Sequence, residues 1–197
     1  ELGLARRDDV PLLGFVGRLA EQKGLELLLP VLDDALANPA QLVLLGTGEA
    51  GYEQQLRDLA QRWPGNAAVI LAYNEAMAHK IEAAADLFLM PSLFEPCGLN
   101  QLYSLRYGTL PLVRRVGGLA DTVVDASPHN LEAGRATGFV FDEPECGALL
   151  EALQRAMDLW YDRANWRQLQ RTAMAQDFSW EQSANQYLEL YRSLLST

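Results

Sequence analysis

Two cations leave the first apolar run of the chain on one loop. In the segment Gly14–Gly24, GFVGRLAEQKG, Arg18 and Lys23 follow the run Leu12–Val16, whose composition is typical of a strand buried on both faces. A guanidinium offers a planar fork of donors and an ammonium a compact charge, so the two together can neutralise a diphosphate leaving group. Spacing alone favours the plainer interpretation, two solvated cations at the start of a helix.

A carboxylate, a proline and a glycine follow another apolar run, Asp86–Met90, in the segment Ser92–Asn100. The proline fixes the turn after Glu95, and Gly98 opens a helix whose first N–H groups are free. Free N–H groups at a helix start attract an anion, and a carboxylate binds sugar hydroxyls, so the segment suits a ligand that carries both. A capped helix beside a surface glutamate is the plainer alternative.

Three further strand ends carry candidate ligand residues. Gly46–Gly48 lets a backbone approach a ligand, but it lacks the third glycine of a dinucleotide fingerprint, and a tight turn is an equally good interpretation. Tyr73 can stack on a nucleobase, although the residue alone favours a tyrosine at the edge of the core. In Gly117–Thr122, the hydroxyl of Thr122 can donate to a phosphate. The alternative there is a flexible connection before Thr137–Asp142.

The cysteines and histidines show no pattern of metal binding or nucleophilic catalysis. Cys97 has no base partner nearby, so we expect a packed small residue rather than a nucleophile. Cys146 lies in an unrelated context, and His79 and His129 have neither a metal-ligand spacing nor a Ser-His-Asp context. The sequence also lacks an Asp-x-Asp motif, which disfavours a metal-bridged diphosphate.

Alternating strands and helices must position these residues. Short apolar runs predict strands at Leu12–Val16, Gln41–Leu45, Ala67–Ala72, Asp86–Met90, Leu110–Val113 and Gly138–Phe141. Helical spacing is found at Gly24–Leu36, Tyr52–Trp63, Glu75–Ala85, Gly98–Tyr107, Glu145–Tyr161, Asn165–Asp177 and Trp180–Leu195. The alternation predicts an α/β fold, a mostly parallel sheet with helices on both faces, whose ligand lies outside the carboxyl ends of the strands. We expect Trp160, Trp166 and Trp180 to dock the last helices on the sheet.

Composition narrows the class of protein. Hydrophobic residues make up 49% of the 197, enough for one large domain with a core. The 16 Lys and Arg against 26 Asp and Glu give a net charge of −10, which argues against a nucleic-acid partner but not against a phosphorylated ligand. No apolar run is long enough to cross a membrane, and the cysteine usage suits a reduced, cytoplasmic protein. Because the chain does not open on Met, we expect a piece of a longer protein.

Taken together, the motifs resemble a known family. GFVGRLAEQKG, LVLLGTGE, FEPCGLNQLYSLRYGTLPLVRRVGGLADTV and GFVF, in this order, are similar to bacterial glycogen synthases and plant starch synthases, from about residue 12 to the C-terminus. The resemblance implies the C-terminal half of a GT-B glycosyltransferase, in which two Rossmann-like domains face a cleft. It also implies transfer of glucose from ADP-glucose to the non-reducing end of an α-1,4-glucan, with retention at the anomeric carbon and without a metal or other cofactor.

The resemblance assigns roles to individual residues. Arg18 and Lys23 would hold the donor pyrophosphate and stabilise the leaving group, and Glu95 would bind the glucose, which makes these three the catalytic set. The implied donor-binding residues are Gly17, Tyr73, Cys97, Gly98, Leu99, Asn100, Gly118 and Thr122. The sequence departs from the family pattern at Asn100, where threonine is common, and at Asn74, where histidine is common. Related retaining transferases have a second glutamate where Tyr103 stands.

The same resemblance divides the chain. We expect residues 1–11 to be a linker from an N-terminal domain, residues 12–178 to be the donor-binding domain, and residues 179–197 to be a helix that packs toward the N-terminal domain. That domain would supply most of the glucan acceptor surface, so the chain alone should bind ADP or ADP-glucose weakly without elongating glucan. The alternatives are a non-catalytic nucleotide-binding or regulatory module and another retaining GT-B transferase of the sucrose- or trehalose-forming type. A NAD-dependent dehydrogenase is weakened by the missing glycine motif.

Overall fold

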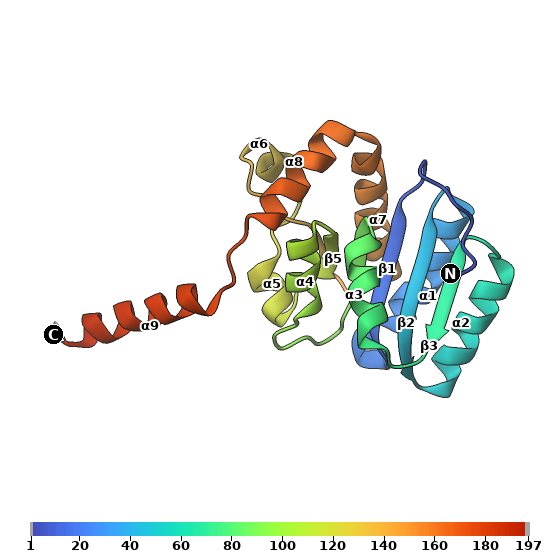
Figure 1. Cartoon of the computed structure of the whole chain (residues 1–197), viewed down its shortest axis with the longest axis horizontal. Helices are drawn as coiled ribbons and strands as arrows, with labels where there is room; N and C mark the ends of the chain where they lie inside the picture. The colour runs from blue at the N-terminus through green and yellow to red at the C-terminus, as the bar shows by residue number, and fades with distance from the viewer. Residues whose placement is uncertain (1, 196–197) are drawn as a thin grey trace.

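The predicted strands all form, and they join in one parallel sheet of a computed structural model that describes residues 2–195. The strands are β1 (Leu12–Leu19), β2 (Gln41–Gly48), β3 (Ala67–Leu71), β4 (Leu87–Met90), β5 (Leu110–Arg114) and β6 (Phe139–Phe141). Their order is β3-β2-β1-β4-β5-β6, a Rossmann-like order that reverses direction between β1 and β4. This order predicts a crevice at the carboxyl ends of these two parallel strands; β1 points downward in Figure 1.

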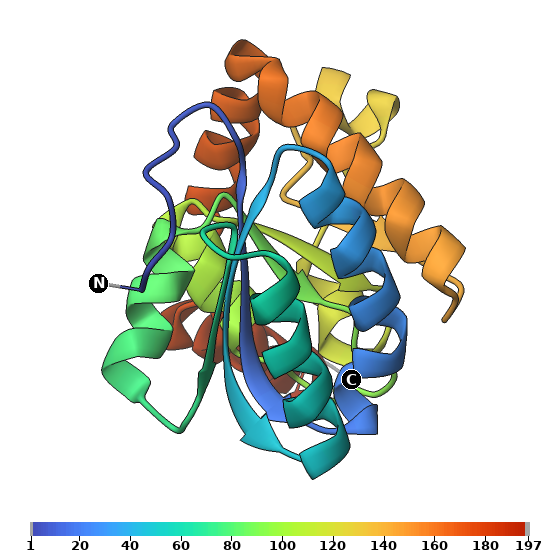
Figure 2. The ribbon, with the colours of Figure 1, turned by 90° about the vertical axis from the view of Figure 1, so that its right-hand side faces the viewer.

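Helices cover both faces of the sheet, as predicted, although the last one extends away from it. They are α1 (Leu25–Ala37), α2 (Ala50–Arg62), α3 (Glu75–Ala84), α4 (Asn100–Tyr107), α5 (Gly117–Thr122), α6 (Pro128–Glu132), α7 (Cys146–Tyr161), α8 (Arg163–Met174) and α9 (Trp180–Leu195). Successive residues of a strand face opposite sides. Accordingly, Leu42 and Leu44 of β2 belong to the apolar core that includes α1 and α2, whereas Val43 and Leu45 cluster with Ile81 of α3 on the other face (Figure 2).

At two glycine segments, the structure excludes the alternative to a ligand role that the sequence left open. Gly46–Gly48 is the end of β2 rather than a tight turn, because a Cβ on Gly46 or Gly48 would collide with a carbonyl oxygen of β1, so the two glycines let these strands pair up to Leu19. The segment Gly117–Thr122 is the short helix α5 rather than a flexible connection, and its first N–H groups follow an extended residue at its N-cap.

The C-terminal helices divide into two kinds. Trp160 of α7 and Trp166 of α8 are each 3% exposed, and the ring of Trp166 stacks on Phe139 of β6, so both helices dock on the sheet as expected. The same expectation is wrong for Trp180, which is 89% exposed. Helix α9 buries none of its residues and extends away from the other elements (Figure 1). Within residues 2–195, no helix is long and apolar enough to span a membrane.

Candidate functional site

The loops that follow β1 and β4 touch because glycines remove the side chains between them. Gly24 has a φ of 70°, and a Cβ on it would collide with the carbonyl oxygen of Pro91. At Gly117 and Gly118, a Cβ would collide with carbonyl oxygens of the turn Glu95–Cys97. Each of these loops therefore lies against the backbone of the next, at the point where the strand order reverses.

An ion pair joins the two loops. The ammonium of Lys23 lies 2.5 Å from Oε2 of Glu95, and the hydroxyl of Ser92 donates to the same oxygen at 3.1 Å. Glu95 is only 8% exposed, so it is not the surface glutamate of the plainer interpretation. Sequence reasoning assigned Lys23 and Glu95 to different parts of a ligand, whereas the structure holds them together in a site where water is largely excluded and charges interact strongly.

Arg18 stands beside this pair at the end of β1. It is exposed, and its guanidinium donates to Oε1 of Gln22 at 2.8 Å. Gln22, which sequence reasoning did not single out, also binds the β4 loop: its Nε2 donates to the carbonyl of Phe94 at 3.0 Å, and its carbonyl accepts from the N–H of Leu93 at 2.9 Å. The position of Arg18 is thus tied to that of the loop that carries Glu95.

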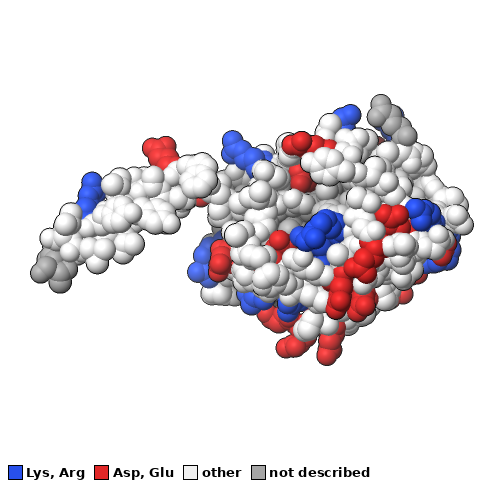
Figure 3. All heavy atoms as spheres, turned by 90° about the horizontal axis from the view of Figure 1, so that it is seen from below, with Lys and Arg blue, Asp and Glu red and all other residues white. Residues whose placement is uncertain are grey.

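A second arginine binds the backbone of the same loop from the neighbouring strand β5. Arg114, at the end of β5, donates through Nε to the carbonyl of Ser92 at 3.0 Å and through Nη2 to the carbonyl of Leu93 at 2.6 Å. Its guanidinium therefore binds the backbone of the loop, whereas Arg18 and Lys23 are bound to side chains at the same edge. Figure 3 looks onto this face and shows a basic patch in a hollow with acidic side chains beside it.

The turn before α4 presents backbone N–H groups. Gly98 has a φ of 72°, and α4 begins at Asn100 with Leu99 as its N-cap. Within residues 2–195, the N–H groups of Gly98, Leu99 and Asn100 donate to no protein acceptor. A residue of positive φ followed by one of negative φ and ψ gives the alternating backbone that forms an anion-binding nest. The turn can therefore take an anion without a metal ion.

Two predictions about side chains of this region need revision. Cys97 is exposed rather than packed, because its backbone, and not its thiol, lies against Gly118. The hydroxyl of Thr122 donates to the carbonyl of Gly118 at 2.5 Å, as a helical residue of α5 bonds the preceding turn. Its proton is thus used within the protein, which disfavours the direct donation to a phosphate that was expected of Thr122.

A cavity of about 350 Å³ opens beside these loops, between β1, β2, α3 and α4. Gly17, Arg18, Tyr73 and Asn100 line it, so four of the predicted residues come together here. Tyr73 is 86% exposed, which excludes the tyrosine at the edge of the core. Asn100 is held by a hydrogen bond from Nδ2 to the carbonyl of Val16 at 3.0 Å. The other predicted residues do not line the cavity but surround the β4–α4 loop next to it.

Sequence reasoning missed a titratable pair in the cavity wall. His79 and Glu82 both line the cavity, and Nδ1 of His79 lies 3.0 Å from Oε2 of Glu82. The imidazole also packs edge-on against Tyr103, with ring centroids 5.6 Å apart. Burial raises the pKa of Glu82, which is 2% exposed, and the neighbouring His79 opposes that shift. The spacing of the two residues on one helix was the available signal.

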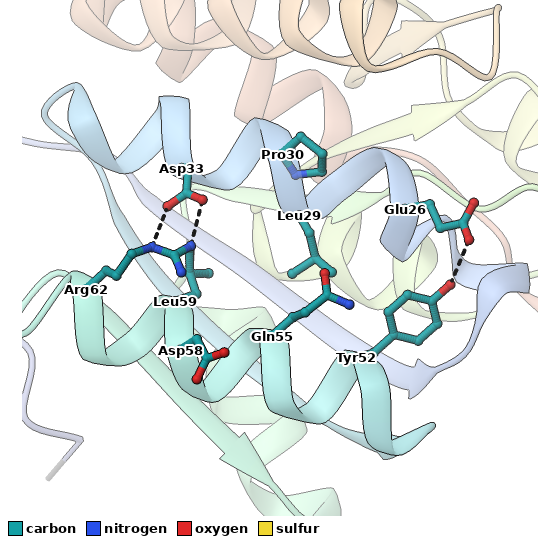
Figure 4. A pocket seen from close by; sticks show the side chains of 9 residues that line it. All are labelled: Glu26, Leu29, Pro30, Asp33, Tyr52, Gln55, Asp58, Leu59 and Arg62. Carbon is teal, nitrogen blue, oxygen red and sulfur yellow. Dashed lines mark hydrogen bonds and ion pairs between the residues drawn. The ribbon is translucent and has the colours of Figure 1, made fainter.

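A larger depression of about 500 Å³ lies elsewhere, between α1 and α2 (Figure 4). Its walls are already paired: Arg62 bonds Asp33 at 2.7 Å, and the hydroxyl of Tyr52 bonds Glu26 at 3.4 Å. None of the predicted ligand residues lines it, and it runs along two helices rather than at the carboxyl ends of the strands. The crevice between β1 and β4 is therefore the candidate site.

Comparison with known proteins identifies the family. A family model described as "Glycosyl transferases group 1" matches residues 3–172. The chain belongs to the group 1 glycosyl transferases. It is 55% identical over 188 residues to a glycogen synthase of Thioalkalivibrio sulfidiphilus, and 53% identical over 195 residues to one of Cellvibrio japonicus. The matches cover 95% and 99% of this chain but 39% and 40% of the relatives, so the chain spans about 40% of their length.

Solved structures confirm the fold and the resemblance to glycogen and starch synthases. The catalytic domain of starch synthase IV from Arabidopsis thaliana, bound to ADP and acarbose, superposes with a TM-score of 0.87 at 35% identity and covers 100% of this chain and 41% of its own. Sucrose-phosphate synthase from Thermosynechococcus elongatus gives a TM-score of 0.66 at 26% identity, with 95% and 46% covered. This group 1 chain is thus more similar to the starch synthase than to the sucrose-phosphate synthase, by both measures.

The ion pair should be measurable as a coupling free energy. Lys23→Met leaves the nearly buried carboxylate of Glu95 without its cation, and we expect the free energy of unfolding to fall by about 1–3 kcal/mol. Glu95→Gln should cost a similar amount, and the double variant should cost less than the sum, by about 1 kcal/mol or more. Urea denaturation measures all four states. Arg57→Met, which breaks the exposed pair with Glu53, is the control and should cost about 0.5 kcal/mol or less. Additive losses at residues 23 and 95 would contradict the pairing.

The raised pKa of Glu82 predicts a pH dependence of stability. A carboxyl with a folded pKa above its ordinary value of 4.5 favours folding below that value, and this contribution is lost as the pH rises through the folded pKa. Glu82→Gln mimics the protonated form and should not lose it. The free energy of unfolding of the variant should therefore gain on that of the wild type as the pH rises from about 4.5 to about 7.5. Urea denaturation over this range measures it, with the exposed Glu75→Gln as control; a constant difference would refute the prediction.

Proposed function

We propose that this chain is the donor-binding part of a retaining glucosyltransferase of the glycogen synthase type. It binds ADP-glucose, and the enzyme to which it belongs transfers the glucose to the non-reducing end of an α-1,4-glucan. One observation carries the proposal. Arg18, the ion pair of Lys23 with Glu95 and a turn of free N–H groups meet at the switch point of a chain that superposes on a starch synthase bound to ADP.

Each group has a part of the donor to bind. Arg18, Lys23 and the N–H groups of the turn before α4 bind the diphosphate. They stabilise the negative charge that grows on it as the nucleotide leaves. Glu95 accepts hydrogen bonds from hydroxyls of the glucose. Tyr73, at the rim of the cavity, stacks on the adenine. No step of this scheme needs a metal ion or other cofactor, because protein groups meet the developing charge.

We propose the division of the chain that the motifs suggest, with residues 12–178 as the binding domain and residues 179–197 as a segment whose helix α9 packs on a preceding domain; residues 196–197 lie outside the described part of the chain. What supports it is the surface of α9, on which Leu190, Tyr191 and Leu194 are more than half exposed. Residues 1–11 would then link the two domains. The preceding domain would complete the cleft and bind the glucan acceptor, and neither a nucleic acid nor a membrane has a role.

Calorimetry tests the donor assignment on the chain itself. We expect ADP-glucose to bind more tightly than UDP-glucose. Glu95→Gln should weaken the binding of ADP-glucose by about tenfold, since loss of a hydrogen bond to a charged group costs about 1.5–3 kcal/mol. The binding of ADP, which lacks the glucose, should weaken much less. The chain alone should not add labelled glucose to glycogen. Incorporation of label would overturn the proposed division, and failure to bind any adenosine nucleotide would overturn the donor assignment.

The full-length enzyme separates catalysis from regulation. Alanine at residue 23 or 95 should lower kcat with glycogen as acceptor, because both groups meet the transferred glucosyl unit or its leaving group. An unchanged kcat with altered regulation would favour a non-catalytic nucleotide-binding module. Transfer to a fructose or glucose phosphate acceptor instead of glycogen would favour the sucrose- or trehalose-forming transferases.

The base contact can be tested apart from the phosphate contacts. Tyr73→Ala removes the exposed ring and should weaken ADP by about fivefold or more, because stacking of a base on an aromatic ring contributes about 1–3 kcal/mol. Binding of inorganic pyrophosphate should stay unchanged. Tyr187→Ala in α9, a tyrosine that is 61% exposed and far along the chain, is the control. Equal effects on ADP and on pyrophosphate would contradict the stacking role.

A further inference from the structure

A buried glutamine lies directly under the turn that presents the free N–H groups. Gln101, in the first turn of α4, is 0% exposed. Its Nε2 donates to the carbonyl of Cys97 at 3.0 Å and to the carbonyl of Gly98 at 3.1 Å. Only the nitrogen of the amide can face two carbonyl oxygens, so the orientation of this side chain is determined by its neighbours.

The same side chain carries an unsatisfied atom. Oε1 of Gln101 is one of three buried side-chain nitrogen or oxygen atoms without a hydrogen-bond partner in the described part of the chain. A Cβ on Gly98 would also collide with this amide, so the turn and the glutamine fit only because residue 98 is glycine. Burial of the unpaired side-chain oxygen of Gln101 is unfavourable. The hydrogen bonds of Nε2 to the carbonyls of Cys97 and Gly98 offset this cost and fix the orientation of the amide.

Peptide planarity converts those two bonds into a direction for the N–H groups. In a trans peptide the N–H points opposite to the C=O of the same plane. The carbonyls of Cys97 and Gly98 point inward to Gln101, so the N–H groups of Gly98 and Leu99 point outward, on the side away from the protein interior. Both N–H groups are thereby held in the orientation that an anion needs before it arrives.

A second element is attached to this arrangement. Nε2 of Gln101 also lies 3.3 Å from Oγ1 of Thr122, whose proton goes to the carbonyl of Gly118. The N–H of Gly118 in turn donates to the carbonyls of Glu95 and Pro96 at 3.2 and 3.1 Å. The turn Glu95–Leu99 is therefore held on one side by α4 and on the other by α5, with Gln101 and Thr122 at the junction.

We propose that Gln101 is a positioning residue that preorganises the N–H groups of Gly98 and Leu99 for a diphosphate, and that Thr122 acts through Gln101 rather than on the phosphate. Neither side chain touches the ligand. The inference rests on the proposed function for the identity of the anion, but its geometric basis is the two inward carbonyls. It deepens that function by naming what keeps the phosphate-binding turn in shape.

The test separates phosphate binding from base binding. Gln101→Met keeps the length of the side chain and removes the hydrogen bonds of Nε2 to Cys97, Gly98 and Thr122. Calorimetry should show ADP and inorganic pyrophosphate weakened by about tenfold, the loss expected for one or two hydrogen bonds to a charged group, while adenosine binds within about twofold of wild type. In ¹⁵N-labelled chain, pyrophosphate should shift the amide signals of Gly98 and Leu99, and this shift should be smaller in the variant.

Matched variants control for packing. Gln176→Met removes an exposed glutamine whose Nε2 also bonds a helix carbonyl, that of Thr172 at 3.1 Å, and should leave all three affinities unchanged. If Gln101→Met does not fold, Thr122 carries the test: Thr122→Val should weaken pyrophosphate, and Thr122→Ser, which keeps the hydroxyl, should restore it. If Thr122 contacted the phosphate directly, Thr122→Val would instead weaken the binding of pyrophosphate more than Gln101→Met does.

Each outcome bears on the proposal. An unchanged ratio of ADP to adenosine affinity in Gln101→Met overturns it, as does a pyrophosphate shift that is absent from Gly98 and Leu99 in the wild type. If pyrophosphate shifts these amides but ADP-glucose does not bind, the positioning role stands and the proposed donor fails. If the wild-type chain binds neither, both are overturned.

Discussion

Backbone carbonyl oxygens occupy the places where side chains would begin on three glycines, and the site depends on this contact. Gly24, Gly117 and Gly118 each lie against a carbonyl of the segment Pro91–Cys97, and any Cβ there would push the loops apart. The consequence reaches every functional group, because an ion pair of 2.5 Å and a pair of inward-pointing carbonyls need positions fixed to fractions of an ångström. The glycines thus act through the packing of backbone on backbone rather than by flexibility.

Much of this architecture was predictable from the chain because parallel sheets bury both faces. Continuous runs of Leu and Val identify each strand, and the alternation with helices leads to the parallel order. The rule that ligands lie at the carboxyl ends then selects the loops of the candidate site, since Arg18 lies at the end of β1 and Tyr73 and Glu95 follow β3 and β4. These inferences rely on the local pattern of apolar residues. Such a pattern predicts the element correctly wherever the element is buried in the core.

The predictions that failed concern partners rather than patterns. The apolar stripe of α9 resembles that of α7, but periodicity reports only which face of a helix is apolar and not what covers it, so Trp180 was expected to be buried. The segment Gly117–Thr122 shows the same limit, since its residues allowed a flexible connection and form the helix α5. The sequence did not single out Arg114, Gln22 and Gln101, because each donates to a backbone carbonyl. A side-chain type does not indicate which backbone carbonyl of another element it will meet in the fold.

The ion pair at the centre of the site has a consequence for selectivity among ligands. A bare diphosphate that draws Lys23 toward itself leaves the nearly buried carboxylate of Glu95 with the hydroxyl of Ser92 alone, which is unfavourable. A sugar diphosphate resolves the conflict, because its phosphates take the ammonium while its hydroxyls donate to the carboxylate. A ligand that carries hydrogen-bond donors beside its phosphates is therefore favoured over a bare diphosphate at this ion pair. The pairing of Lys23 with Glu95 thus supports the proposed nucleotide-sugar site over a general phosphate site.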